Sequence, residues 1–580
     1  MTPLLNKLLL LLRQDRWLLA ILASACLLYC VGITWGLPSS DGWDNDGVAP
    51  RDFLPGLLMS YTPGSHYIYP PLHLILLTLL TLPIWSVALL KAGTTAPEAV
   101  RQTFIQVPVM TSLALVARLL SALFSLGSLL ALYKLGEQLG GKKVARLAAL
   151  VGLVNIPLTY YAHTTNLESP YLCWMLWSLV YAGLAATEQS VQRFRRACFF
   201  AVAAMTTKDQ AYAALLAPLA LLAFLLLYRS DDKKRDAKYL LTTSLLSAFA
   251  LLLIDGALFN PTGFRDRVLE LSGPASQDYA QYTNDMSGRL QLIREFVPFV
   301  SNIAYPTALS LFGLVGLWFA VRARDFARLL PLLAALSFTL FFNLVARRLE
   351  ARFVLPQALM LGLYVAWGLE RAWSLLNARW PHAQKPLLSV AALLLAYSLH
   401  GAMSVDAQLL TDPRYEAERY LLAHVQPNER VEIYGGNVYL MHYPPTAQIE
   451  RVSAGELRPN PLPGIRENIV PYEDVESRRP DWIVSPECFD WRYRVDGPAP
   501  SDMPGLRDGH QIQHVVLRGF GNRAQIDYFR SLYAGTTNYE PVAATVSQAQ
   551  FWRNIRLHAS LSCKMSIFRR RPDAVIATKP

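Results

Sequence analysis

Acidic side chains cluster directly after the first long apolar run of this 580-residue sequence. Asp41, Asp44 and Asp46 lie in DGWDNDG, where their odd and even spacings do not fit one face of a helix. We therefore expect a loop at a membrane boundary. One carboxylate within hydrogen-bond reach is sufficient to remove a proton from an alcohol, so Asp46 is the first candidate for a general base and Asp44 the second. The alternative is an ordinary solvated turn.

The rest of this loop carries imidazoles and phenols beside apolar residues. His66, Tyr69 and His73 in SHYIYPPLH are, like Asp41, candidates for substrate binding. Asp52 stands directly before the apolar run FLPGLL, where capping of a helix N-terminus is the plainer explanation.

A second polar turn, within YYAHTTNLESPY at residues 160–171, separates two apolar runs. An acid at a membrane boundary is costly unless it is paired or hydrated. Glu168 is therefore either a second carboxylate of the site or the structural partner of a nearby cation. Tyr161 and His163, in the same stretch, are candidates for substrate binding.

Lys208 and Asp209 interrupt an otherwise apolar stretch, where burying two charges costs several kcal/mol. Adjacent residues on a helix point in different directions, so the two are not expected to pair with each other. Lys208 is therefore a candidate anion binder.

A dense cationic turn follows later in the chain. It consists of Arg347, Arg348 and Arg352 in ARRLEARF. Arginine presents a planar fork of donors suited to phosphate oxygens. Together with Lys208, and with Arg265 or Arg267, this turn could hold the phosphate of a lipid. The alternative is pairing with Glu350 or with the C-terminal tail.

The composition indicates what positions these groups: 53% of residues are hydrophobic and the mean hydropathy is +0.25. Apolar runs of about twenty residues, the length that crosses a bilayer as a helix, continue through residue 404. We therefore expect a membrane domain over 1–404 and a soluble domain over 405–580. Eleven spans are predicted, at 17–37, 109–135, 144–162, 169–187, 196–207, 211–228, 239–258, 299–321, 329–346, 353–373 and 387–404.

The basic loops predict the orientation of these spans. Lysines and arginines lie near the N-terminus and in five short loops, which the positive-inside rule assigns to the cytoplasm. If the run at 68–91 crossed the membrane, all five basic loops would lie outside. We therefore predict that this proline-broken run is a re-entrant or surface-lying helix rather than a span. The N-terminus is then cytoplasmic, whereas the first loop, 38–108, and the C-terminal domain are extracytoplasmic.

The tail alternates helix and strand patterns and predicts a small α/β domain. DAQLLTDPRYEAERYLLAHVQPNERVEIYG indicates a helix, a turn and a strand, and RPDWIVSP a second strand. Further strand candidates lie in YFRSLYAGTTNYEPVAATV and KMSIFRRRP. Cys488 and Cys563 form a disulfide if the tail faces an oxidising compartment, a question the sequence leaves open. The other four cysteines fit small apolar side chains.

Several classes of function are disfavoured. The formal charge of +11 is dispersed over short loops rather than gathered on one basic face, which argues against nucleic-acid binding. The sequence contains no His/Cys cluster with zinc spacing, no nucleotide-binding glycine loop after a strand and no nucleophile elbow. A sugar nucleotide is therefore a poor donor candidate, and a lipid-linked donor suits an external site.

The order of these motifs resembles the GT-C glycosyltransferases, notably bacterial proteins similar to dolichyl-phosphate-mannose protein mannosyltransferases and to lipid A aminoarabinose transferase, of glycosyltransferase family 39 type. The resemblance rests on DGWDND, YPPLHLILLTLL, ARLLSALFSLGSLLALYKLGEQLGGKKVARLAALVGLVNIPLTYYAHTTNLE, TTKDQAY, ARFVLPQALMLGLY and DPRYEAERYLLAHVQPNERV. It covers most of residues 1–435 and implies a GT-C fold with about eleven to thirteen crossing helices.

The resemblance implies inverting transfer of a sugar from a polyprenyl-phosphate donor to an acceptor hydroxyl on a protein, lipid or glycan. Asp46 or Asp44 matches the catalytic base, Glu168 matches an acid of the second external loop, and Lys208 and Arg352 would face the lipid phosphate. Asp46-Gly47 replaces the family's usual Asp-Glu pair, so the base and any use of a divalent cation stay open. The alternatives are a lipid or polysaccharide transporter and a binding module anchored in the membrane.

Overall fold

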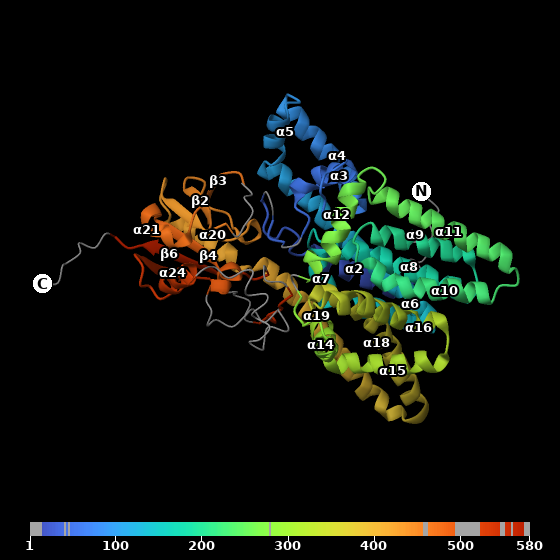
Figure 1. Ribbon diagram of the computed structural model, residues 1–580. Helices are drawn as coiled ribbons and strands as arrows, with labels where there is room; N and C mark the ends of the chain where they lie inside the picture. Colours follow the sequence, from blue (N-terminus) through green and yellow to red (C-terminus); the bar gives the residue numbers. More distant parts are fainter. Residues whose placement is uncertain are drawn as a thin grey trace. The chain divides into compact units, whose positions relative to one another are not determined.

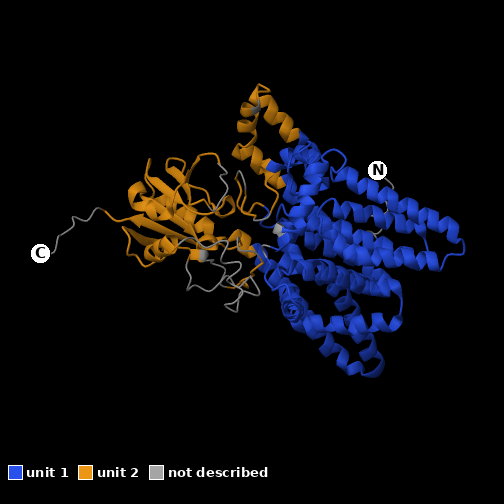
Figure 2. Cartoon of the chain, viewed as in Figure 1, with its two compact units in different colours: residues 1–33, 52–82, 116–406 blue, residues 34–51, 83–115, 407–580 orange. Residues whose placement is uncertain are grey.

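The computed structural model describes residues 14–39, 42–44, 47–277, 280–455, 462–493, 523–545, 551–557 and 561–572. The chain forms two compact units, coloured separately in Figure 2. The first comprises residues 1–33, 52–82 and 116–406, and the second comprises 34–51, 83–115 and 407–580. The second unit thus combines the C-terminal tail with two parts of the predicted first loop.

The first unit is helical (Figure 1). A core within it is built from apolar side chains of α6, α14, α15 and α18. Leucine and alanine, both strong helix formers, dominate segments such as AYAALLAPLALLAFLLLY. The helices up to residue 410, some of which continue into the second unit, are α2 (Arg16–Cys30), α3 (Phe53–Tyr61), α4 (Leu72–Ala92), α5 (Pro97–Phe104), α6 (Val107–Leu153), α7 (Ile156–Ala162), α8 (Glu168–Glu188), α9 (Val191–Met205), α10 (Ala211–Tyr228), α11 (Lys233–Ile254), α12 (Pro261–Ser272), α13 (Pro274–Gln277), α14 (Met286–Ala304), α15 (Thr307–Ala323), α16 (Phe326–Phe338), α17 (Leu344–Ala346), α18 (Ala351–Arg379) and α19 (Gln384–Leu410).

In the described residues, seven helices are long and apolar enough to cross a membrane, or up to eight if the bent pair α14–α15 is one span. The protein is therefore an integral membrane protein with a multi-spanning helical part, as predicted. Not every one of the eleven predicted spans is a helix of spanning length. α2 and α9, which overlap the predicted spans 17–37 and 196–207, have only 15 residues each.

The run at 68–91, predicted to be re-entrant or surface-lying, contains a continuous 21-residue helix, α4, of spanning length and composition. Pro70 and Pro71 precede this helix and so do not break it. Pro83 lies inside α4, as prolines often do in membrane helices, where neighbouring groups satisfy the freed backbone. The prolines of this run therefore do not prevent a continuous helix.

The segment predicted as one span at 299–321 is instead two helices, α14 and α15, bent by 113° at the break between them. Tyr305 caps the end of α14 with an extended backbone, and Pro306 occupies the N-cap of α15. The residue before a proline avoids the helical region, which explains the position of the break. The turn predicted between 109–135 and 144–162 is present as a local break at Gly140 and Gly141 within α6.

The C-terminal part of the second unit contains a six-stranded sheet in the order β3-β2-β1-β4-β6-β5. The strands β3, β2, β1 and β4 are parallel, and β6 pairs antiparallel with both β4 and β5. Its elements are α20 (Pro413–His424), β1 (Arg430–Ile433), β2 (Gln448–Ser453), β3 (Ile465–Ile469), α21 (Val475–Arg478), β4 (Trp482–Pro486), α22 (Glu487–Asp490), α24 (Arg523–Tyr533), β5 (Tyr539–Ala544) and β6 (Met565–Arg570). The predicted α/β domain is therefore confirmed.

Local patterns located several of these elements correctly. The predicted helix, turn and strand after residue 406 correspond to α20, a left-handed residue at Asn428 and β1. RPDWIVSP contains β4, and KMSIFRRRP contains β6. The stretch YFRSLY, included among the strand candidates, is part of the helix α24 instead. Its Tyr528 and Phe529 are buried in an aromatic core with Tyr434, Tyr472, Tyr493 and Tyr539.

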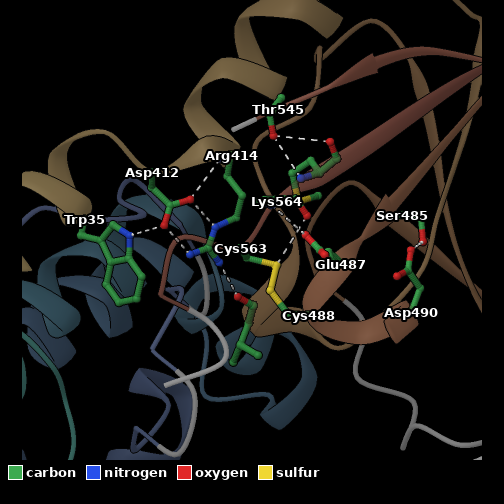
Figure 3. The surroundings of a disulfide bond; sticks show 12 residues. Trp35, Asp412, Arg414, Ser485, Glu487, Cys488, Asp490, Thr545, Cys563 and Lys564 are labelled. Carbon is green, nitrogen blue, oxygen red and sulfur yellow. Dashed lines mark hydrogen bonds and ion pairs between the residues drawn. A yellow bond between two sulfur atoms is a disulfide. The ribbon is translucent and has the colours of Figure 1, made fainter. Parts of the chain in front are cut away.

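Cys488 and Cys563 form a disulfide, with 5.7 Å between their Cα atoms and 75 residues of sequence separation (Figure 3). A cross-link of this span stabilises mainly by restricting the unfolded chain, and the expected contribution is about 4 kcal/mol. We expect Cys563→Ser to lower the unfolding temperature of the C-terminal domain, measured by differential scanning calorimetry, and the reduced wild type to match it. A variant at Cys198, which is unpaired, serves as the control. Unchanged unfolding in Cys563→Ser would contradict the prediction.

Candidate functional site

Glu168 is the first residue of α8, and its carboxylate accepts a hydrogen bond from the ammonium of Lys208. Glu168 is fully buried, and the Lys208 side chain is 19% exposed. A carboxylate at a helix N-terminus is favoured by the helix dipole. The second oxygen, Oε2, is buried with no hydrogen-bond partner among the described residues. The pair thus presents a buried acceptor beside an ammonium that carries three N–H donors.

The turn at 206–210 that carries Lys208 is held from several sides. The backbone N–H of Leu72 donates to the carbonyl of Thr206 at 3.0 Å. Gln210 donates to the hydroxyl of Tyr171 at 3.0 Å, and the Tyr171 ring lies 5.7 Å below the Lys208 ammonium. The turn is therefore fixed by α4 and α8, which limits the positions that the ammonium can adopt.

Asp209 pairs with Arg267 rather than with its neighbour Lys208, as expected for adjacent residues. Both Asp209 oxygens accept hydrogen bonds at 2.7 Å from Arg267, whose side chain is 1% exposed. Arg267 also contacts Asp255 at 3.2 Å. Burial raises the pKa of Asp255 to about 7, against the opposing effect of Arg267. Arg267 is thus neutralised within the protein and anchors the turn beside Lys208 to α12.

Asp255 and Tyr67 are members of this network that the sequence analysis missed. The Tyr67 hydroxyl donates to the carbonyl of Asp255 at 2.5 Å, and its ring lies 5.0 Å from the Arg267 guanidinium. Asp255 had been enclosed in the predicted span 239–258, but α11 ends at Ile254. The signal that could have found it is a charged residue within an apolar run.

Arg348 and Arg352 share one carboxylate, that of Glu350. Both guanidiniums also lie over the ring of Phe353, at 4.9 and 4.6 Å. The pairing with Glu350 is the alternative that the sequence analysis had kept open. The two guanidiniums and the Glu350 carboxylate therefore form one cluster beside the ring of Phe353. Tyr161, buried in α7, is within electrostatic range of both Glu168 and Arg352.

Arg347 has a different environment from the other two arginines. Its backbone is left-handed, with φ of 53°, which turns the chain after α17. Its guanidinium donates to the carbonyl of Tyr282 at 2.8 Å and to the Gln277 side chain at 2.5 Å. The side chain therefore holds the segment around 277–282.

The predicted imidazole and phenol ligands are spread over the first unit. Both ring nitrogens of His163 face backbone carbonyls, of Thr159 and Val31, at 2.7 Å, and burial lowers the pKa of His163 to about 4. His73 is buried in α4, with no hydrogen-bond partner for either nitrogen among the described residues. His66 is exposed and pairs with Glu270 at 3.2 Å, whereas Tyr69 is half-buried.

The predicted bases belong to the second unit or are not described. Asp44 is 6% exposed and directly follows Trp43, which is 1% exposed. Asp41 and Asp46 lie outside the described residues. Asp52 occupies the N-cap position of α3, as expected, although its side chain makes no capping hydrogen bond. Among the described residues, no group of three or more His, Cys, Asp and Glu side chains is arranged to hold a metal ion.

His442 fixes the loop before Asp44 in a manner that depends on pH. Its ring contacts Glu418 of α20 through Nδ1 at 2.6 Å and the carbonyl of Pro38 through Nε2. Burial opposes the charged imidazole, but hydrogen bonding to Glu418 prevails and raises the pKa of His442 above its ordinary value of 6.5, with Arg414 acting in the opposite direction. Only the charged ring has two N–H groups to donate to both acceptors.

We therefore expect His442 to stabilise the second unit fully below about pH 6.5 and to lose this contribution as the pH rises through its folded-state pKa. Solvent screening keeps the effect small. The measurement is the difference in unfolding temperature between the wild type and His442→Gln as a function of pH. A difference that grows with rising pH would refute this assignment.

Comparison with known proteins places the Glu168–Lys208 pair in a recognisable segment. Residues 105–254 match the family model of dolichyl-phosphate-mannose-protein mannosyltransferase. This segment, less than half of the chain, contains both residues of the pair. The match confirms the expected resemblance and supports the expectation of a glycosyltransferase. Among curated proteins, none matches the chain.

Solved structures with a similar fold include two forms of ArnT from Cupriavidus metallidurans. The apo form has 14% identity and a TM-score of 0.48, over 95% of this chain and 97% of that one. The form bound to undecaprenyl phosphate has 14% identity and a TM-score of 0.43, over 95% and 98%. The oligosaccharyltransferase AglB from Archaeoglobus fulgidus, in complex with an inhibitory peptide and a dolichol-phosphate, has 12% identity and a TM-score of 0.44, over 96% and 89%.

Proposed function

We propose that this protein is an inverting glycosyltransferase that moves a sugar from a polyprenyl-phosphate donor to an acceptor hydroxyl at the extracytoplasmic face of the membrane. The observation that carries the proposal is the buried Glu168–Lys208 pair inside the segment that matches a dolichyl-phosphate-mannose-dependent family. A buried ion pair is often less stabilising than apolar side chains of the same size. Its presence in the protein interior therefore points to a role other than stability. A lipid phosphate is an anion that the Lys208 ammonium can bind.

In the proposed reaction, Asp46 or Asp44 removes the proton of the acceptor hydroxyl while its oxygen attacks the anomeric carbon. The bond between that carbon and the phosphate oxygen breaks, and the polyprenyl phosphate leaves with the electron pair. Attack from the side opposite the leaving group inverts the anomeric carbon. The phosphate needs no proton when cations stabilise its growing charge.

Lys208 and the group of Arg348 and Arg352 supply these cations. The planar guanidinium forks of Arg348 and Arg352 match the oxygens of a phosphate that gains charge as it leaves. Arg347 supports the group through its contacts with Tyr282 and Gln277. Arg267, neutralised by two carboxylates, is not assigned to the phosphate.

Glu168 and the neighbouring aromatic groups are assigned to the sugar and the acceptor. The unpartnered Oε2 of Glu168 is a hydrogen-bond acceptor, and a sugar hydroxyl is a donor that would satisfy it. Tyr161, within electrostatic range of Glu168, is assigned to the same subsite, whereas His66, Tyr69, His73 and His163 remain candidate contacts elsewhere in the first unit. The extracytoplasmic assignment is supported by the disulfide of the C-terminal domain, which suits an oxidising compartment.

The test is transfer by membranes containing this protein, incubated with radiolabelled polyprenyl-phosphate sugars and, in parallel, with labelled sugar nucleotides. We expect label to move covalently into protein, lipid or glycan from the polyprenyl-phosphate donor alone. Transfer from the sugar nucleotide would overturn the donor assignment. Movement of the intact labelled lipid across the vesicle membrane without any covalent product would instead support a transporter.

A further inference from the structure

Arg414, near the start of α20, is enclosed by two indole rings of the loop that carries Asp44. Its guanidinium carbon lies 4.0 Å from the ring centre of Trp43 and 5.4 Å from that of Trp35. The Arg414 side chain is fully buried, and both tryptophans are 1% exposed. A buried guanidinium between aromatic faces is held more firmly than an exposed one. The loop and the C-terminal domain are thus packed together inside one unit.

Asp412 completes this arrangement with two hydrogen bonds at 2.8 Å from Arg414 (Figure 3). The indole N–H of Trp35 donates to the same carboxylate at 3.0 Å. A third Arg414 donor reaches the carbonyl of Val438 at 2.8 Å. The pair is therefore neutralised within the domain and hydrogen-bonded to the loop. We call Trp35, Trp43, Asp412 and Arg414 the loop anchor.

Two further hydrogen bonds hold the loop against the C-terminal domain. The N–H of Gly36 donates to the Tyr415 hydroxyl at 2.9 Å, and the Trp43 indole donates to the carbonyl of Leu440 at 2.6 Å. Gly36 has a φ of +68°, and a Cβ at this position would lie 2.6 Å from the Trp43 ring. A glycine is therefore needed for the loop to close onto Trp43.

The anchor ends one residue before Asp44. A general base works only within hydrogen-bond reach of the proton that it removes, and a displacement of about 1 Å can cost on the order of 100-fold in rate. Loops lose such precision unless rigid elements support them. The buried ion pair and the two indoles provide that support, since they join the residue next to Asp44 to the folded α/β domain.

We propose that Arg414 is a positioning residue, through which the C-terminal domain holds the first loop at Asp44 in the geometry required for transfer. The inference rests on the proposed function. It assigns the α/β domain a role in the chemical step, in addition to any role in acceptor binding.

The experiment compares the wild type with Arg414→Lys, which keeps the charge but loses the planar fork and its stacking. Trp43→Phe is a second variant, which keeps an aromatic ring and loses the hydrogen bond to Leu440. The control is Arg419→Gln, an exposed arginine on the same helix. Two quantities are measured in the full-length protein: hydrogen–deuterium exchange of a peptide covering 34–44, and kcat and donor KM for transfer.

We expect both variants to exchange faster over 34–44 while the strands of the sheet keep their protection, and kcat to fall on the order of 100-fold in Arg414→Lys with donor KM unchanged. Arg419→Gln should match the wild type. Wild-type kcat in a variant with faster exchange would overturn the positioning role. So would unchanged exchange in both variants. If the strands of the sheet lose protection in Arg414→Lys, that variant is unfolded, and the same comparison is then made with Trp43→Phe.

The outcomes separate this inference from the proposed function. If the wild type transfers no sugar, the proposed function is refuted, and so is the role of Arg414 in transfer. Faster exchange over 34–44 in Arg414→Lys would still show that the loop anchor holds the loop. If the wild type transfers sugar and both variants do so equally well, the function stands and the positioning role alone is refuted.

Discussion

Lys208→Met is expected to lower transfer from a polyprenyl-phosphate donor by about 100-fold or more and also to destabilise the membrane domain. Removal of one preorganised group that stabilises charge in the transition state typically costs about 100- to 1,000-fold in kcat. The stability effect arises because Glu168, fully buried, loses its ionic partner. Breaking a buried ion pair from one side costs about 3–5 kcal/mol. Transfer assays and thermal unfolding in detergent measure the two effects.

The double variant Lys208→Met/Glu168→Gln separates catalysis from stability. Replacing both charges removes the uncompensated carboxylate, so the unfolding temperature should recover most of the loss. Transfer should not recover, because the cation for the phosphate is still absent. If transfer returns together with stability, the pair is structural only. Lys234→Met, at an exposed lysine in the first turn of α11, is the matched control and should change neither quantity.

Asp46→Asn and Asp44→Asn are expected to leave the protein folded, and the variant that removes the true base should lower kcat by about 100- to 10,000-fold. General-base catalysis typically contributes rate factors of this size. Asparagine keeps the size and one oxygen of the side chain but cannot accept the proton of the acceptor hydroxyl. The measurement is kcat at saturating donor, alongside the unfolding temperature.

The pH profile adds a second readout for these carboxylates. With its base intact, the enzyme should lose kcat/KM as the pH falls through the pKa of that carboxylate, and this acidic limb should disappear in the variant that lacks it. Asp52→Asn, at the N-cap position of α3, is the control and should retain both the rate and the limb. Full activity in both Asp44→Asn and Asp46→Asn would eliminate the assignment of the base to this loop.

The separation of a membrane domain from an α/β domain followed from local patterns. Apolar runs of membrane-spanning length located α10 at 211–228, with both ends correct. Short apolar segments between turn signals identified β1, β4 and β6 in the tail. These predictions succeed because hydropathy over twenty residues and the period of a strand are properties of contiguous sequence.

Irregular helices were harder to predict because context decides them. The orientation assigned to the basic loops predicted that the proline-broken run 68–91 is a re-entrant or surface-lying helix. It contains instead α4, a continuous helix of spanning length with Pro83 inside it. At Pro306 the chain instead bends by 113° between α14 and α15. A proline removes one donor in both places. Whether the helix continues depends on neighbours that satisfy the freed backbone.

By itself, the sequence determined that this is a multi-spanning membrane protein with an α/β tail, and that Asp44, Glu168 and Lys208 are candidates for chemistry. Only the tertiary structure decided how the charges pair. Lys208 joins Glu168 across 40 residues, Arg267 joins Asp209 across 58, and Trp35 reaches Asp412 across 377. The reason is physical: the sequence shows which buried charges need a partner, but the partner is the opposite charge that folding brings within hydrogen-bond distance.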